Sequence, residues 1–453
     1  MNAAPSDLNL PPGTIFPSDP DYDQARRVWN GTIDRRPAAV VRCTTVDDVI
    51  ATVRAAAKAG IPLAVRGGGH SVPGFSTCDD GIVLDLASMS SVDVDPDARV
   101  AGVGGGATWG MVDAETERFG LATTGGLVST TGVGGLTLGG GIGWLTRRCG
   151  LACDNLLSAE VVTATGEVVR AGGDGDQELL WGLRGGGGNF GVATSFEFRL
   201  TPLQSVFGGI ALFHMARARD VFTFYRDWVG TIPDELTPML VFLEGPDGEP
   251  IPPELRGQPV IAIVACHMAE PEVAMADLRP IEDLRPELFA YESMPYTAMQ
   301  QMFDADVPAG DRYYFKGGFG AAYPDEMIEV LVEHFSRRPG SRCEVDLHHM
   351  GGAASRVGEM ETAFPGRSAL ITSNVYGCWT DPHDDEAQRN WVRALSTELD
   401  RFGTGGDYVN FMSEVESANA QTAYGDERLS RLRELKRRYD PTNLFQLNQN
   451  ITP

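Results

Sequence analysis

Three glycine-rich segments in the first half of the chain constrain its fold more than any other feature. They are Arg66-Gly67-Gly68-Gly69-His70-Ser71 and the stretches 125–143 and 185–191. Glycine has no Cβ, so a glycine run lets backbone N–H groups approach an anionic or planar ligand. A tight turn would explain the first segment alone. The second is unlike a flexible linker, because it interleaves residues that require a core: Leu127, Val128, Val133, Leu136, Leu138 and Ile142. The pattern predicts a ligand cradle with the imidazole of His70 at its edge.

Apolar periodicity predicts an α/β unit that leads into the first glycine run. Residues 38–41 form a short strand, Thr45 caps a helix with Val49 and Val53 on its apolar face, and residues 63–65 form the next strand. Further strands are predicted at 82–86, 99–103, 193–200, 260–264 and 370–375, with a hairpin at 161–169 and helices at 216–228, 325–335 and 385–402. The pattern alone indicates the α+β class.

Length and charge exclude several classes of protein. A chain of 453 residues predicts two or three domains, and its formal charge of −25 disfavours nucleic acid or an anionic membrane as a partner. No uncharged apolar run approaches the ~18 residues of a membrane span. The N-terminal stretch lacks a basic region followed by an apolar one, so we expect no signal peptide and a cytoplasmic location. Seven scattered cysteines predict structural thiols, with no metal site.

A nicotinamide site is disfavoured. Residues Gly102, Gly104 and Ala107 fit a dinucleotide fingerprint formally. The acidic residue that such a site requires about 20 positions later is missing, because that region reads Leu121-Ala122-Thr123-Thr124-Gly125-Gly126.

Motifs spread over nearly the whole chain resemble one family. The stretches 66–71, 132–135 with 139–143, and 187–192 are similar to motifs of the FAD-linked oxidases of the vanillyl-alcohol-oxidase type, berberine-bridge-enzyme branch. The stretches 407–411, 439–445 and 447–451 resemble the closing motifs of that branch. The resemblance implies a two-part FAD-binding domain of the PCMH type, residues 1–203 and 405–453. It also implies a substrate-binding domain, residues 204–404, built as an antiparallel sheet backed by helices.

The resemblance implies FAD with a single covalent link through His70. Relatives with two links use a cysteine where this chain has Val128, and Cys149 and Cys153 are poor substitutes. The implied cofactor-binding residues are Arg66, Gly67, Gly68, Gly69, His70, Ser71, Gly126, Val128, Thr130, Thr131, Gly132, Gly135, Gly140, Gly143, Gly191, Val192, Tyr408, Asn410 and Asn448.

The candidate catalytic residues are Tyr408, Glu344, Asp346, His348 and Thr131. Relatives place the tyrosine over the flavin, so Tyr408 is the first candidate base. Glu344, Asp346 and His348 alternate, which puts them on one face of a strand. That face is either solvated or catalytic, and the Gly351-Gly352 pair that follows resembles an active-site crossing. Lys316 is a weaker candidate. The resemblance gives Thr131, just before Gly132, control of oxygen access.

The predicted function is a covalent-FAD oxidoreductase that oxidises a small secondary-metabolite alcohol, amine or activated C–H group by hydride transfer to flavin N5, with O2 as acceptor. Two alternatives stay open. One is an oxygenase that uses an oxygenated flavin, since Val128, Thr131 and Leu136 resemble the monocovalent subgroup of the enterocin-pathway flavoenzyme. The other is a flavin-binding protein without catalysis. The substrate and the oligomeric state are not predicted.

Overall fold

The first unit of the fold is a parallel sheet that ends at the first glycine run. In the computed structural model, which describes residues 8–413 and 419–453, this sheet has the order β1-β3-β2. Its elements are α1 (Tyr22–Ala25), β1 (Ala39–Arg42), α2 (Val46–Ala59), β2 (Leu63–Arg66) and β3 (Ile82–Asp85). Thr45 caps α2 as expected: its hydroxyl accepts from the Asp48 N–H at 3.2 Å, and the Asp48 carboxylate accepts from the Thr45 N–H at 3.0 Å. Strand β2 therefore delivers the chain directly into the glycines.

A second, antiparallel sheet carries the other two glycine-rich segments. Its order is β4-β5-β9-β7-β8, from β4 (Val92–Asp95), β5 (Val100–Gly104), β7 (Leu156–Val162), β8 (Val168–Gly172) and β9 (Val192–Arg199). Around it lie α3 (Trp109–Glu117), α4 (Val133–Leu138), α5 (Thr146–Cys149), α6 (Ala152–Asn155) and α7 (Gln177–Leu183), with the short pair β6 (Leu121–Ala122) and β10 (Thr201–Pro202). The predicted hairpin is the β7–β8 pair.

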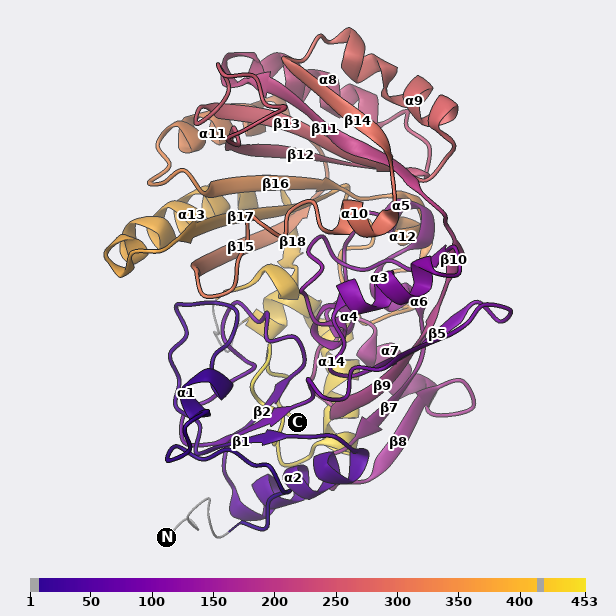
Figure 1. Cartoon of the computed structure of the whole chain (residues 1–453), viewed down its shortest axis with the longest axis vertical. Coiled ribbons are helices and arrows are strands. Elements are labelled where there is room, and N and C mark those ends of the chain that lie inside the picture. The colour runs from indigo at the N-terminus through magenta and orange to yellow at the C-terminus, as the bar shows by residue number, and fades with distance from the viewer. Residues whose placement is uncertain (1–7, 414–418) are drawn as a thin grey trace.

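The second half of the chain forms one eight-stranded antiparallel sheet, in the upper part of Figure 1. Its order is β14-β11-β13-β12-β16-β17-β15-β18, from β11 (Val206–His214), β12 (Leu236–Glu244), β13 (Pro259–His267), β14 (Leu288–Met294), β15 (Arg312–Gly320), β16 (Cys343–His349), β17 (Ile371–Trp379) and β18 (Gly403–Asp407). The helices of this half are α8 (Ala218–Val229), α9 (Pro271–Asp283), α10 (Tyr296–Gln300), α11 (Asp325–Ser336), α12 (Gly352–Arg356) and α13 (Asp385–Leu399). This confirms the α+β class.

The two faces of the large sheet have different roles. On β16, Val345 and Leu347 join the core formed with α8, α9, α11 and α13. The alternate residues Glu344, Asp346 and His348 point to the opposite face, because successive side chains of a strand alternate. The helices thus cover one face, and the other is turned toward the glycine-rich segments.

The C-terminal segment returns to the first half of the molecule. The helical stretch α14 (Asn419–Tyr439), interrupted at Gly425, packs Leu429, Leu432 and Leu435 into the core of the second sheet. At its C-terminal end, the buried Lys436–Asp440 ion pair, 2.7 Å long, clamps the chain: the Lys436 ammonium also donates to the carbonyls of Asn189 and Phe445, at 3.0 and 2.9 Å. Residues 445–449 are thereby held beside the third glycine segment.

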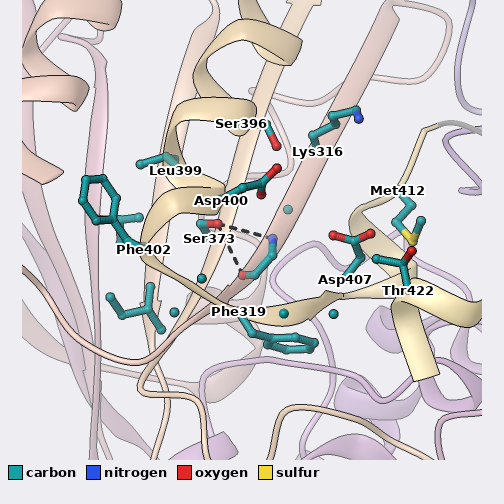
Figure 2. Close-up of a pocket in the computed structure, with 18 of the residues that line it drawn as sticks. Lys316, Phe319, Ser373, Ser396, Leu399, Asp400, Phe402, Asp407, Met412 and Thr422 are labelled. Atoms are coloured by element: carbon teal, nitrogen blue, oxygen red, sulfur yellow. Dashed lines mark hydrogen bonds between the residues drawn. The ribbon is translucent and has the colours of Figure 1, made fainter. Parts of the chain in front are cut away.

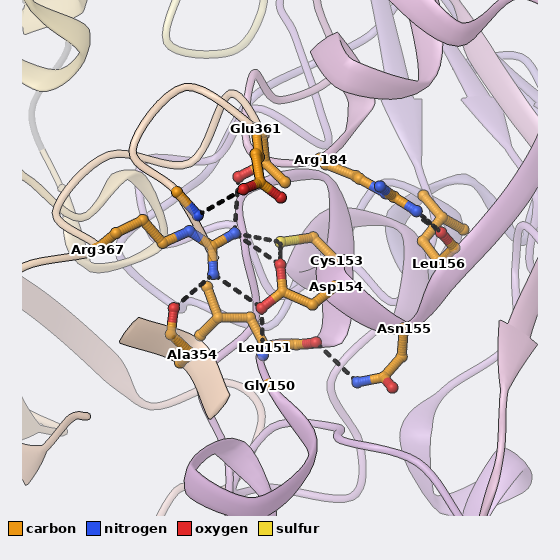
Figure 3. A network of polar contacts seen from close by, with 12 residues as sticks. Gly150, Leu151, Cys153, Asp154, Asn155, Leu156, Arg184, Ala354, Glu361 and Arg367 are labelled. Carbon is orange, nitrogen blue, oxygen red and sulfur yellow. Dashed lines mark hydrogen bonds and ion pairs between the residues drawn. The ribbon is translucent and has the colours of Figure 1, made fainter. Parts of the chain in front are cut away.

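Buried polar contacts join the two halves (Figure 3). Arg367 donates to both carboxylate oxygens of Asp154, at 2.6 and 2.8 Å, and to the carbonyl of Ala354 at 3.2 Å. Arg147 bridges similarly to the carbonyls of Leu236 and Met350, at 2.8 and 2.6 Å. Breaking these contacts would leave the charge of a buried arginine or aspartate without its partner, which is costly. The contacts therefore hold the large sheet in place over the glycine-rich half.

Within residues 8–413 and 419–453, no helix is long and apolar enough to cross a membrane. All seven cysteines are unpaired, and six of them are buried.

Candidate cofactor and substrate site

A cavity of about 390 Å³ lies between the glycine-rich segments and the large sheet. The glycines of all three segments form one wall, namely Gly67, Gly68, Gly69, Gly126, Gly132, Gly134, Gly135, Gly139, Gly187, Gly188 and Gly191. Strands β12, β15, β16 and β17 supply the opposite wall. We call these the glycine wall and the sheet wall.

The glycine wall is held together by backbone contacts that leave no room for side chains. A Cβ on Gly68 would lie 2.5 Å from the backbone nitrogen of Gly132, and a Cβ on Gly132 would lie 2.4 Å from the backbone nitrogen of Gly68. At Gly135 and Gly188, in contrast, a Cβ would meet nothing within 4 Å. The wall is therefore dense inside and leaves open space on its cavity side, as a bound planar or anionic group requires.

The C-terminal segment adds polar groups to this wall. Asn448 donates to the carbonyls of Phe445 and Gly188, at 2.9 and 3.3 Å. Its buried side-chain oxygen and the buried side-chain nitrogen of Gln449 have no partner among the described residues, although both side chains line the cavity. Buried polar atoms are normally hydrogen-bonded, so these orphans indicate a polar ligand. The wall fits the predicted FAD.

His70 lies at the rim of the glycine wall, under Trp29. The two rings stack with centroids 4.9 Å apart and planes 17° apart. The Nε2 atom of His70 is 2.9 Å from the Thr130 hydroxyl. Burial lowers the pKa of His70 to about 4, against the opposing effect of the Asp304 carboxylate. The imidazole is therefore neutral at pH 7, and Thr130 occupies one of its two nitrogens.

Strand register determines which side chains lie next to one another on the sheet wall. Asp346 pairs with Val241 on one side and Asn374 on the other, while Glu344 pairs with Tyr376. Residues directly opposite on neighbouring strands share a face, so polar side chains gather at its centre. Around them, aromatic and aliphatic side chains line the cavity: Met239, Val241, Phe303, Val307, Phe315 and Phe411.

Burial shifts every titratable group of this wall toward its neutral form. It raises the pKa of Glu344 to about 7, although the Tyr376 hydroxyl donates to that carboxylate at 2.5 Å. Burial, and then the charge of Glu344, raise the pKa of Asp346, whose carboxylate accepts from the Asn374 amide at 3.4 Å. Burial lowers the pKa of His348 to about 4, and its Nε2 atom has no partner among the described residues.

Tyr408 follows directly after β18 and lines the cavity. Its oxygen accepts from the backbone N–H groups of Gly141 and Ile142, at 2.9 and 3.4 Å, and from the Asn410 amide at 2.9 Å. These hydrogen bonds lower the pKa of Tyr408, but burial has the larger effect and raises it to about 12. The phenol therefore stays protonated at neutral pH and is held in a fixed position.

Most of the sequence-predicted site residues meet in this one cavity. It is lined by Glu344, Asp346, His348, Tyr408, Thr131, His70, Gly67, Gly68, Gly69, Ser71, Gly126, Val128, Gly132, Gly135, Gly191, Asn410 and Asn448. Five predicted residues do not line it: Arg66, Thr130, Gly140, Gly143 and Val192. Arg66 forms a buried ion pair with Asp85 at 2.7 Å behind the first glycine run. Gly143 packs on the backbone of Gly125 and Gly126, Gly140 packs on Phe364, and Val192 lies in a core under β3.

Sequence reasoning missed Trp29, Asn374 and Tyr376. No motif surrounds Trp29, and its stacking on His70 is a tertiary contact. Asn374 and Tyr376 lie on β17, and their place beside Asp346 and Glu344 depends on strand register.

Lys316 lines a second cavity, of about 290 Å³, on the far side of β15 and β18 (Figure 2). Asp400 and Asp407 share that cavity, and burial raises the pKa of both. The structure thus separates Lys316 and Asp407 from the sheet wall.

Two family models match the chain. One, described as an FAD binding domain, covers residues 37–172, and the other, described as berberine and berberine like, covers residues 407–452. An FAD-linked oxidoreductase of Dictyostelium discoideum is 31% identical over 96% of this chain and 93% of that protein. The (R)-6-hydroxynicotine oxidase of Paenarthrobacter nicotinovorans is 30% identical over 98% of both chains.

Solved structures agree with these matches. The 6-hydroxy-D-nicotine oxidase of Arthrobacter nicotinovorans superposes with a TM-score of 0.87, at 28% identity and full coverage of both chains. The berberine bridge enzyme of Eschscholzia californica superposes with a TM-score of 0.85 at 20% identity, over 98% of this chain and 97% of that one, which shows the shared fold.

Proposed function

This chain belongs to the berberine-bridge-enzyme-like family of FAD-dependent oxidoreductases, and from that premise we propose that it is an oxidase with FAD held through one covalent link to His70. Its substrate would be a small organic molecule with an oxidisable alcohol, amine or activated C–H group, and O2 its electron acceptor. One observation carries the proposal: the cavity brings the glycine wall, His70 and a face of buried titratable side chains together.

The glycine wall and the C-terminal segment would hold the cofactor. Gly135 and Gly188 leave space for it, and the orphaned polar atoms of Asn448 and Gln449 face the same cavity. When bound, FAD would accept a hydride from the substrate. The absence of a cysteine at Val128 supports a single link, and the low pKa of His70 leaves a neutral, nucleophilic nitrogen for it.

The sheet wall would handle the substrate proton. A general base is most effective when its pKa lies near the working pH, and burial moves Glu344 and Asp346 toward that range. The Tyr408 phenol, with a pKa of about 12, is better suited to donating a hydrogen bond. We therefore assign proton removal to Asp346, with Glu344 and Tyr376 beside it, and substrate orientation to Tyr408 and His348.

The same separation of cofactor and substrate roles would apply to the domains of the chain. We assign residues 1–203 and 405–453 to the cofactor and residues 204–404 to the substrate. The position of α14 in the core of the second sheet supports this assignment. The seven unpaired cysteines are compatible with a reducing compartment such as the cytoplasm.

A second candidate function is an oxygenase that transfers an oxygen atom to its substrate. Thr131 lines the cavity, and an FAD-dependent monooxygenase of Fusarium proliferatum is 42% identical, over 39% of this chain and 34% of that protein. The product distinguishes the two functions, because an oxygenase incorporates labelled oxygen from ¹⁸O2 and an oxidase does not.

The decisive experiment is to denature the purified protein with acid and measure the mass of the chain. We expect a yellow pellet, a mass increase of one FAD, and flavin on a proteolytic peptide that contains His70. A colourless pellet with free FAD in the supernatant would remove the covalent link while keeping the cofactor. A protein that binds no flavin in either form would overturn the function.

A further inference from the structure

We propose that the substrate carries a basic nitrogen, protonated in solution, and that Asp346 and Asn374 bind this nitrogen on the sheet wall. The inference rests on the proposed function, because it concerns the same cavity, and it narrows that function to amines.

The polar groups of the sheet wall are mainly acceptors. The Asn374 amide nitrogen donates to one oxygen of Asp346, so its side-chain oxygen faces elsewhere, is buried and has no partner among the described residues. The Tyr376 hydroxyl donates to Glu344, and this bond uses its one proton. A ligand with an N–H or O–H group would satisfy the Asn374 oxygen, and a positively charged donor would also favour the carboxylate form of Asp346, which only accepts.

No cationic side chain balances these acceptors. Of the residues that the structure describes, not one lysine or arginine lines the cavity. A carboxylate or phosphate on the substrate would thus meet two carboxyl groups and no counter-charge. An ammonium group would supply the missing positive charge, and it has donors only, which matches a wall of acceptors.

The rest of the sheet wall is apolar. Met239, Val241, Phe303 and Phe315 surround the polar centre, so most of the ligand is hydrophobic. A sugar would place hydroxyl groups, which accept as well as donate, against these side chains with few partners. An aromatic or aliphatic amine buries its carbon skeleton there and presents its nitrogen to Asp346.

Binding should release a proton. Burial and the charge of Glu344 raise the pKa of Asp346, which favours its protonated form in the empty site, and an adjacent ammonium would favour the carboxylate. The other titratable or charged groups that line the cavity or act on Glu344 are Tyr376, His348, Tyr408, His70, Asp306 and Arg342. Since the free site holds the extra proton, affinity for the ammonium form should rise with pH until the amine itself loses its charge.

The test is calorimetric titration of the flavin-loaded protein with matched ligands. We would use 2-phenylpropan-2-amine and 2-phenylpropan-2-ol, with the naphthyl analogues of both, because the carbon that bears the nitrogen or oxygen has no hydrogen to lose. We expect the amine to bind at least roughly tenfold more tightly than the alcohol, the effect of one hydrogen bond to a charged group. Heats measured in two buffers of different ionisation enthalpy should show proton release for the amine alone.

Two variants locate the effect. Asp346→Asn keeps the side-chain shape and should bring the affinities of amine and alcohol together. Asp407→Asn is the matched control, because Asp407 is also a carboxyl with a raised pKa but lines the second cavity (Figure 2). It should leave the tenfold preference intact.

Failure of this inference is distinguishable from failure of the proposed function. Equal affinity for amine and alcohol, binding of neither amine, or an unchanged preference in Asp346→Asn would each overturn the inference while the protein still carries flavin. If Asp346→Asn does not fold, the wild-type protein still tests the inference through proton release. Amine binding without proton release would overturn it.

Discussion

The glycine wall and the sheet wall of the cavity are built on opposite principles. At Gly68 and Gly132 the backbones touch, and any Cβ would collide with a main-chain atom that cannot move aside. At Asp346, Glu344 and His348 the backbone is regular sheet, and the chemistry lies in side chains that could be exchanged without disturbing it. On the proposed assignment, the difference teaches that main-chain shape recognises the cofactor, whereas side chains select the substrate.

The largest effect is expected from Gly68→Ala. The added Cβ would lie 2.5 Å from the Gly132 nitrogen, so two backbone segments must separate, at a cost of about 3 kcal/mol or more. We expect almost no flavin-loaded protein, measured as the ratio of flavin to protein absorbance, and a lower melting temperature. Gly135→Ala is the control: it lies inside α4, where alanine is about 1 kcal/mol better than glycine. It should fold at least as stably and still lose flavin, since its Cβ enters the open space. Full flavin content in both variants would refute a backbone cradle.

His70→Ala tests the proposed covalent link at the glycine wall. It should bind flavin that dissociates on acid denaturation, a change from complete to zero covalent attachment measured by mass spectrometry. His383→Ala, at an exposed histidine, should keep the link. Colour that stays with the denatured His70→Ala chain would show that another residue holds the cofactor.

Asp346→Asn tests the sheet wall. Anaerobic flavin reduction should slow by roughly 10²–10⁴-fold, the usual range for loss of a general base. In the wild type the rate should rise with pH through about 7, the pKa of Glu344, and above it, because the raised pKa values of Glu344 and Asp346 let these carboxyls become bases only as they lose their protons. Asp346→Asn should flatten that rise.

Tyr408→Phe is the companion variant in the same stopped-flow experiment. It removes a phenol but no carboxylate, so it should keep the pH dependence and reduce the rate less than Asp346→Asn. The reverse ranking, with Tyr408→Phe the slower variant, would return the base role to Tyr408.

The smallest effect is expected at Thr131, which lines the cavity beside Gly132 on the glycine wall. Thr131→Leu narrows the cavity on the glycine wall, and we expect reoxidation of the reduced protein by O2 to slow by about tenfold or less while anaerobic reduction by substrate is unchanged. Equal reoxidation rates in both proteins would mean that Thr131 only packs against the cofactor.

Local features of the fold were predictable, and non-local ones were not. The capping box of α2 and the alternation of Glu344, Asp346 and His348 depend on neighbours in sequence, and the structure has both. The pairing of Asp346 with Asn374 depends on the register of two strands separated by an intervening helix and loop, which periodicity does not encode.

Helix α4 shows how tertiary contacts override local preference. Its glycines disfavour a helix, and the sequence indicated only a cradle with a core face there. In the fold, the Val133 N–H donates to the carbonyl of Ala107 at 2.9 Å, and Val133 and Leu138 enter the core of the second sheet. The shifted pKa values of the sheet wall could not be predicted from sequence either, because they result from burial, which is a property of the assembled fold.

The clamp formed by Lys436 and Asp440 sets an order of events during biosynthesis. It holds residues 445–449 against the cavity, and Asn189 binds the same segment through the Gln449 carbonyl and the Ile451 N–H. The ribosome makes His70 and the first two glycine-rich segments long before these residues, so a nascent chain has the proposed anchor before the cavity can close. We therefore expect loading of the cofactor to follow translation of residue 449 and the folding back of this segment, and we expect a chain truncated just upstream of it to be colourless.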